Sequence, residues 1–374
     1  MHNKTESKPF DKIFFGIVIA LLVIGIFSFV SASFGILAKN TAKFYSVVLN
    51  HILLGLVGGL ITLYITSRIP YTFWKKKAFY IFLGAVGATC LVFVPGLALK
   101  HGGAQRWIAI GPVSFQPAEL LKIAFVIYFA GWLSWAKGRV KDFKWSILPL
   151  IILLGIISVV LLKQPDTKSL ILMIVSALGM LIVSGVRWKH VLLTGGVAVV
   201  GLLILLTFKP YLKDRLMTFM DPSRDPSGSS YQLQQSLIAI GSGGITGRGY
   251  GQSIQKFSYL PEPQGDSIFA VMGEEYGFIG GIFIIALYVA FALRGLKIAN
   301  STNDQFGKLL VTGLVILITA QSFLNIASIV GLFPLTGVPL VFMSHGGTAL
   351  LFSLAAVGII LNVSRSNKHN TVVK

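Results

Sequence analysis

The chain has 374 residues, of which 54% are hydrophobic and only 12% charged, with a mean hydropathy of +0.79. A soluble domain carries about 25% charged residues, so the composition excludes an ordinary soluble protein. The net charge of +19 would suit a nucleic-acid partner, but its placement along the chain, described below, argues against one. The single Cys90 excludes an internal disulfide framework.

Ten apolar runs are long enough, or nearly so, to cross a membrane. Roughly 20 apolar residues span the ~30 Å hydrocarbon layer, and lipid offers no partner to a free peptide group, so these runs must be helical. In chain order the expected spans lie at residues 13–34, 44–66, 79–94, 117–136, 147–162, 169–185, 190–208, 267–293, 309–331 and 347–363. We therefore expect one all-α polytopic membrane domain over residues 1–374, with both termini on the same side.

Lysine and arginine are distributed unevenly between the connections. With the N-terminus inside, the inner segments hold 19 of them and the short outer connections only six. Short loops rich in Lys and Arg stay on the cytoplasmic side of a membrane. The sequence therefore predicts a protein of the cytoplasmic membrane, with both termini in the cytoplasm, and no nucleic-acid partner.

One connection, residues 209–266 between the seventh and eighth spans, is much longer than the others and is expected on the outer side. Long ordered loops tend to carry function. Residues 231–240 have helical propensity, and a glycine-rich run follows at 241–251. This run lacks the pattern G-x-G-x-x-G, and Tyr250 stands where a phosphate-binding loop needs Lys, so we interpret it as a turning loop.

Charged residues within or at the ends of spans usually face one another or a cavity. Pro117 suits the first turn of a helix, and Glu119 and Lys122, three residues apart, then share one face and can pair. The pair either lines a cavity or only allows Lys122 to enter the membrane. Before this helix, Arg106 precedes Trp107, which belongs to the same site or is an interfacial anchor.

Two more groups of polar residues lie towards the outer side. Asp166 occupies a short turn, where it is simply solvated or lies near the outer end of the bundle that holds Lys122. Gln321, Asn325 and Ser328 form a stripe on one helical face. Interhelical hydrogen bonding alone would explain such a stripe.

Asp266 closes the long loop directly before a span. Partial burial there would raise the pKa of its carboxyl towards that of a useful general base, and the alternative is a helix N-cap. Glu274 and Glu275 lie deeper in the same span and, being adjacent, point in different directions. No metal-ligand spacing occurs among the six His residues. A transporter, a flippase and an enzyme acting on a lipid-linked substrate all remain open from the residues alone.

A series of short motifs runs along nearly the whole chain. They are residues 31–33, 103–108, 116–122, 164–166, 221–222 followed by 225–226, 239–244, 261–262, 266 with 268–271 and 273–275, and 334–340 with 344–347. In these motifs and their order the chain resembles the SEDS family of the bacterial cytoplasmic membrane, which includes FtsW, RodA and SpoVE. The loop ending in residues 259–267 looks more like the division branch, FtsW. The chain departs from the usual family pattern at Gln264 and Gly265, at residues 167–169 after Gln-Pro-Asp, and at His345 and Thr348.

The resemblance implies a peptidoglycan glycosyltransferase that joins lipid II units onto a growing β-1,4 glycan strand at the outer face of the membrane. It also implies a class B penicillin-binding transpeptidase and other divisome membrane proteins as partners. Asp266 matches the catalytic aspartate, here interpreted as the general base. No tightly bound cofactor is expected, although a divalent cation, Mg or Mn, is one candidate for neutralising the leaving diphosphate. A lipid II flippase or transporter and a scaffold for the transpeptidase are the alternatives.

Some of the expected substrate-binding residues belong to the polar groups described above, and the others are implied by the resemblance. Four of them are cations that would neutralise the diphosphate, namely Arg106, Lys122, Arg215 and Arg248. The others are Trp107, Glu119, Asp166, Glu262 and Ser344.

Overall fold

The computed structural model describes residues 10–38, 40–101, 104–110, 113–221 and 229–367. Within these residues, ten helices are long and apolar enough to cross a membrane. The ten spans are α1 (Lys12–Leu37), α2 (Thr41–Leu49) with η1 (Asn50–Val57) and α3 (Gly58–Arg68), α4 (Tyr71–Cys90) with η2 (Leu91–Phe93), α5 (Pro117–Ala136) with η3 (Lys137–Lys141), α6 (Phe143–Lys163), α7 (Thr167–Ser184), α8 (Trp188–Phe208), α12 (Ile268–Asn300), α13 (Gln305–Ile329) and α14 (Gly347–Asn367).

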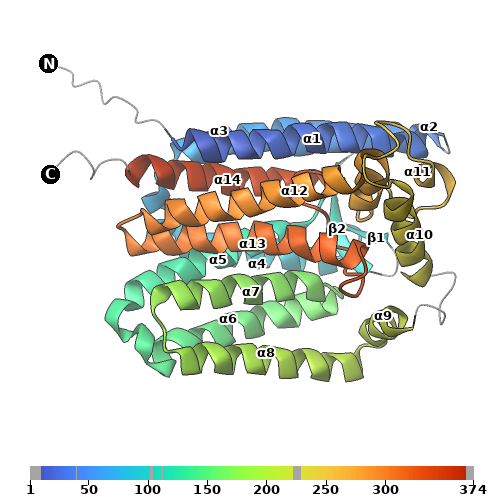
Figure 1. The fold of residues 1–374 in the computed structure, drawn as a ribbon. Helices are drawn as coiled ribbons and strands as arrows, with labels where there is room; N and C mark the ends of the chain where they lie inside the picture. Colours follow the sequence, from blue (N-terminus) through green and yellow to red (C-terminus); the bar gives the residue numbers. More distant parts are fainter. Residues whose placement is uncertain (1–9, 39, 102–103, 111–112, 222–228, 368–374) are drawn as a thin grey trace, which may run out of the picture.

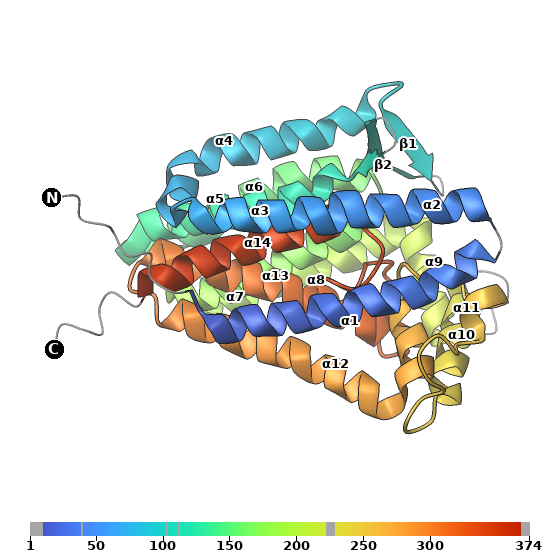
Figure 2. The same cartoon turned by 90° about the horizontal axis from the view of Figure 1, so that it is seen from above.

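The remaining elements gather at one end of the bundle, here called the loop end (Figures 1 and 2). They are the strands β1 (Ala98–His101), β2 (Ala104–Ile110) and β3 (Val113–Phe115), and the short helices α9 (Pro210–Met220), α10 (Ser229–Ser242) and α11 (Gln255–Ser258). The start of α1 and the end of α14 lie at the opposite end, here called the terminal end. The expectation of ten spans with both ends of the chain on one side is therefore confirmed for the described residues.

The centre of the bundle is formed by α5 and α13, whose apolar windows are each 72% buried, whereas that of α8 is 11% buried. Close packing at the centre depends on a small residue, Gly313 of α13. A Cβ there would lie 2.5 Å from Val126 Cγ1 and 2.7 Å from Met180 Sδ. Small residues allow helices in lipid to approach closely, and the exposed apolar face of α8 at the edge suits contact with lipid.

Two local features differ from the expected pattern. The strands β1, β2 and β3 form an antiparallel sheet in that order, which no expected element covered. The helices α4 and α12 also extend beyond the expected apolar runs, to Tyr71 and Asn300. Their added turns carry lysines at the terminal end, where long side chains reach out of an apolar layer while the backbone remains helical.

Candidate functional site

The connection between α13 and α14 crosses the loop end, and its residues 336–339 form what we call the carbonyl segment. Its four consecutive backbone carbonyls each accept a hydrogen bond from a side chain of another element. The pairs are Arg215 Nη1 to the Thr336 carbonyl at 2.9 Å, Lys168 Nζ to that of Gly337, Asn325 Nδ2 to that of Val338 at 2.8 Å, and Gln321 Nε2 to that of Pro339 at 3.3 Å. The segment therefore joins α7, α9 and α13 at one place.

The carboxylate of Asp266 lies against this segment and is partly exposed. A Cβ added at Gly337, whose φ is +66°, would lie 3.1 Å from Asp266 Oδ2 and 3.7 Å from Arg215 Nη2. The absence of a side chain at Gly337 lets both charged groups approach the backbone. Asn325 Nδ2 also donates to the backbone carbonyl of Asp266 at 2.8 Å, which ties the aspartate to α13. The N-cap of α12 is Ser267, so the alternative that Asp266 caps this helix is wrong.

Three cations from three elements lie at the carbonyl segment or beside a cation that does. Arg215 is half-buried on α9, and burial lowers the pKa of its guanidinium, as does the positive charge of Arg106, whereas Asp266 raises it. Arg106, on β2, donates from Nε to the Gln164 carbonyl at 3.0 Å and so ties the sheet to the turn before α7. Lys168, in the first turn of α7, reaches Gly337. The local charge is therefore positive, which suits an anionic ligand.

Lys168 is the cation that the interpretation of the sequence missed. It follows the Gln-Pro-Asp turn at one of the positions where the chain departs from the family pattern. This departure from the family pattern was the only feature of the sequence that could have pointed to Lys168. The contact itself could not be predicted, because it joins the lysine to a backbone carbonyl far along the chain.

The expected pairing of Glu119 with Lys122 is confirmed, at 2.9 Å between Oε2 and Nζ. Lys122 Nζ also donates to Gln321 Oε1 at 2.6 Å, so the pair connects through Gln321 to the carbonyl segment. Both charged side chains are under 10% exposed, and the cavity beside them holds only about 10 Å³. Such a space fits about one water molecule. The arrangement supports an ion pair that positions the segment, rather than one that touches a substrate.

Two other expected binding residues are engaged in local structure. Asp166 is fully buried and accepts from Ser169 Oγ at 2.8 Å at the start of α7. Ser344 Oγ accepts from the Leu340 backbone N–H at 2.8 Å and so closes the turn before α14. Their polar atoms thus hold the ends of α7 and α14 beside the site.

Trp107 and Glu262 border the loop end at different places. Trp107 is half-buried on β2, where it pairs with Leu99 of β1. Glu262 is exposed and accepts from Gln264 Nε2 at 3.1 Å, beside a hollow between the long loop and the end of α1. Their roles in substrate binding stay predictions.

Arg248 belongs to a second cluster, which fastens the glycine-rich loop to α12. Its Nε lies 3.6 Å from Glu274 Oε1. Glu275 pairs with the buried Lys256 at 2.7 Å and accepts from Ser31 Oγ at 2.6 Å. Both glutamates also accept hydrogen bonds from Ser253, Glu274 from its Oγ and Glu275 from its backbone N–H, so the expectation that they point in different directions is wrong. The cluster ties α1, α12 and the loop together, so Arg248 is engaged away from Asp266.

Within the described residues, no group of three or more His, Cys, Asp or Glu side chains could hold a metal ion. Arg215 and Lys168, which reach the same segment as Asp266, are cations and do not fit a resident divalent cation. A divalent cation therefore stays a prediction for which the protein supplies one carboxylate.

A bundle of apolar helices with one charged, partly exposed site at its end defines an integral membrane protein that works at a membrane surface. The family model described as "Cell cycle protein", for FtsW, RodA and SpoVE, matches residues 11–369. The chain belongs to this family.

Several relatives are similar over most of the chain. A protein of Geobacter sp. (strain M18) named "Probable peptidoglycan glycosyltransferase FtsW" is 36% identical over 355 residues, covering 95% of this chain and 96% of the relative. A protein of Trichlorobacter lovleyi with the same name is 37% identical, covering 96% of each chain. Stage V sporulation protein E of Bacillus subtilis is 35% identical, covering 83% of this chain and 85% of its own.

Solved structures share the fold. A chain described under "Structural coordination of polymerization and crosslinking by a peptidoglycan synthase complex" matches with a TM-score of 0.77 at 24% identity, covering 96% of this chain and 99% of that one. The rod shape determining protein RodA of Thermus thermophilus matches with a TM-score of 0.70 at 23% identity, covering 96% and 98%. The polytopic architecture is therefore that of the family.

Proposed function

We propose that the protein is a peptidoglycan glycosyltransferase that polymerises lipid II into β-1,4 glycan strands during cell division. The FtsW relatives support the reaction and the division role. The observation that carries the proposal is the partly exposed carboxylate of Asp266, which shares the carbonyl segment with Arg215 and Lys168. The concentration of Lys and Arg at the terminal end supports a cytoplasmic position for both termini and the outer face of the cytoplasmic membrane for the site.

In the proposed reaction, Asp266 takes the proton of the acceptor sugar's 4-hydroxyl while that oxygen attacks the anomeric carbon of the donor. The bond between this carbon and the diphosphate oxygen breaks, and undecaprenyl diphosphate leaves with the electron pair. Arg215 and Lys168 are the side chains proposed to neutralise the charge that develops on the diphosphate, and Arg106 adds positive charge. Attack opposite the leaving group converts an α-linked donor into a β-linked product.

A class B penicillin-binding transpeptidase is the proposed partner, together with other divisome membrane proteins. The similarity in fold to a chain from a peptidoglycan synthase complex supports this assignment. Co-purification of the two membrane proteins, with and without lipid II, tests it. A transpeptidase that fails to co-purify, and that leaves the polymerisation rate unchanged, would exclude the partner.

The test of the reaction uses purified protein in vesicles supplied with lipid II from outside. Glycan polymer should form, and Asp266→Asn should lower the rate by about 10²–10⁴-fold, because the substitution keeps the shape but removes the base. Polymerisation by this variant at the wild-type rate would refute the assignment of Asp266. Translocation without polymer would favour a flippase, and neither activity would favour a scaffold.

The distribution of polar groups supports the polymerase over the flippase. Glu119 lies in the first turn of α5, and Gln321 and Asn325 lie in the last turns of α13, so the polar network occupies the loop-end half of the bundle. A route for a lipid-linked sugar across the membrane needs polar groups along both halves. The buried residues of α13 from Phe306 to Leu317 are almost all apolar.

A further inference from the structure

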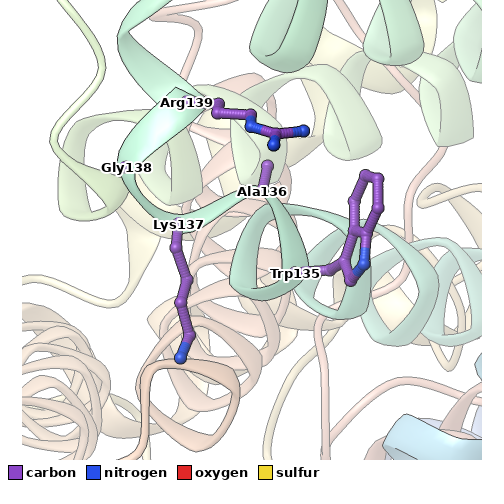
Figure 3. A pocket seen from close by; sticks show the side chains of 5 residues that line it. All are labelled: Trp135, Ala136, Lys137, Gly138 and Arg139. Carbon is purple, nitrogen blue, oxygen red and sulfur yellow. The ribbon is translucent and has the colours of Figure 1, made fainter.

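The terminal end carries two neighbouring hollows, one at the turn after α5 and one between α5 and α6, far from the site of the proposed reaction. One, of about 400 Å³, is lined by the turn Trp135–Arg139 (Figure 3). The other, of about 300 Å³, is lined by the indoles of Trp132 and Trp145 and by aliphatic side chains of α6 that include Leu148 and Ile152. One hollow is thus beside cations and the other is largely apolar.

Three indoles join the two hollows. The ring centroid of Trp135 lies 5.4 Å from that of Trp132 and 5.5 Å from that of Trp145. Trp132 Nε1 donates to the Trp145 carbonyl at 3.0 Å, which holds α5 and α6 in register. The guanidinium of Arg139 lies 5.1 Å from the centre of the Trp145 ring. Figure 3 shows Arg139 and Trp135 on the same side of the turn, with Lys137 pointing away.

The segment 137–144 is strongly basic. It holds four exposed cations, Lys137, Arg139, Lys141 and Lys144, and one carboxylate, Asp142. In the part of the chain that the structure describes, none of the four cations forms a salt bridge. Membrane topology alone explains basic residues at this end. It does not explain an arginine held over an indole at the mouth of an apolar hollow.

We propose that the two hollows together bind one anionic glycerophospholipid of the leaflet at the terminal end. The phosphate lies between Arg139 and Lys144, and an acyl chain lies along the α6 wall at Leu148 and Ile152. A guanidinium forms charge-assisted hydrogen bonds with phosphate, and basic pockets between membrane helices recognise anionic headgroups. Lipid binding at this end requires no glycosyl transfer, so this proposal can be tested independently of the proposed reaction.

Native mass spectrometry of the detergent-purified protein, with added phosphatidylglycerol or phosphatidylcholine, measures this binding. The wild type should retain phosphatidylglycerol preferentially. The double variant Arg139→Gln and Lys144→Gln should bind it about 30-fold more weakly, because each cation near an anionic headgroup contributes about fivefold. Arg139→Lys should keep most of the affinity. The matched control replaces Lys76 of α4 and Lys297 of α12, exposed cations at the same end, with Gln, and should bind like the wild type.

Three results would overturn the proposal. Equal retention of phosphatidylcholine would show that the apolar hollow acts alone, and equal weakening in the control would show diffuse surface charge. Displacement of the lipid by excess glycerol 3-phosphate would show a site for a free phosphate only. Unchanged thermal unfolding verifies that each variant is folded, and Arg139→Gln alone replaces the double variant should the latter unfold.

Discussion

Removal of the Lys122 charge should destabilise the protein, and removal of Glu119 together with it should restore part of the loss. The two side chains are buried and 2.9 Å apart. Breaking a buried ion pair from one side costs about 3–5 kcal/mol because the other charge stays buried without a partner. Lys122→Met should therefore lower the free energy of unfolding by that amount.

The double variant Glu119→Leu and Lys122→Met removes both charges but leaves Gln321 Oε1 without the donor that lies 2.6 Å away. An unsatisfied buried acceptor costs about 1–3 kcal/mol. The double variant should therefore recover about 2 kcal/mol relative to Lys122→Met. Lys163→Met, which removes an exposed cation at the loop end, should change stability by less than about 0.5 kcal/mol.

Equilibrium unfolding in mixed micelles of dodecylmaltoside and SDS measures these differences, and lipid II polymerisation is measured on the same samples. A double variant as unstable as Lys122→Met would refute the ion-pair reasoning. A double variant that recovers stability and keeps kcat, but raises the KM for lipid II at least 100-fold, would refute the positioning role, because the pair would then bind the substrate itself.

Three further outcomes are expected. Lys168→Met should raise the KM for lipid II by about tenfold, since a charge-assisted contact contributes roughly 1.5 kcal/mol, whereas Lys163→Met should match the wild type in a polymerisation assay. Gly337→Ala should lower kcat, because the new Cβ would lie 3.1 Å from Asp266 Oδ2 at a φ of +66°; wild-type kcat would contradict this. Lys256→Met should lower the free energy of unfolding by about 3–5 kcal/mol, because it leaves the buried carboxylate of Glu275 without its partner. A variant that unfolds at the same denaturant concentration as the wild type would disprove this.

Much of the fold followed from composition and spacing. Apolar length alone located all ten spans, because lipid leaves the backbone no alternative to a helix. The pairing of Glu119 with Lys122 followed from their separation by three residues in a helix. Interhelical hydrogen bonding was one explanation for the stripe of Gln321, Asn325 and Ser328. Gln321 and Asn325 do bond to backbone carbonyls outside α13, whereas Ser328 Oγ donates to the Asn325 carbonyl within the helix.

The rest depended on contacts that leave no local pattern. The strands β1, β2 and β3 have four, seven and three residues, too short for alternation to stand out. Lys168 meets a carbonyl 169 positions away, and a carbonyl is the same at every residue. Arg248 was grouped with the diphosphate-binding cations because charge alone does not identify which carboxylate a cation meets; the structure pairs it with Glu274.

The carbonyl segment has a consequence for the kinds of mutation that the site tolerates. Its four hydrogen bonds use the peptide backbone, so a change of side chain at Thr336 or Val338 leaves every acceptor in place. A deletion or insertion of one residue would instead offset all four acceptors from their donors at once. The spacing between α13 and α14, more than the identity of these side chains, is therefore what keeps Arg215 and Lys168 aligned with Asp266.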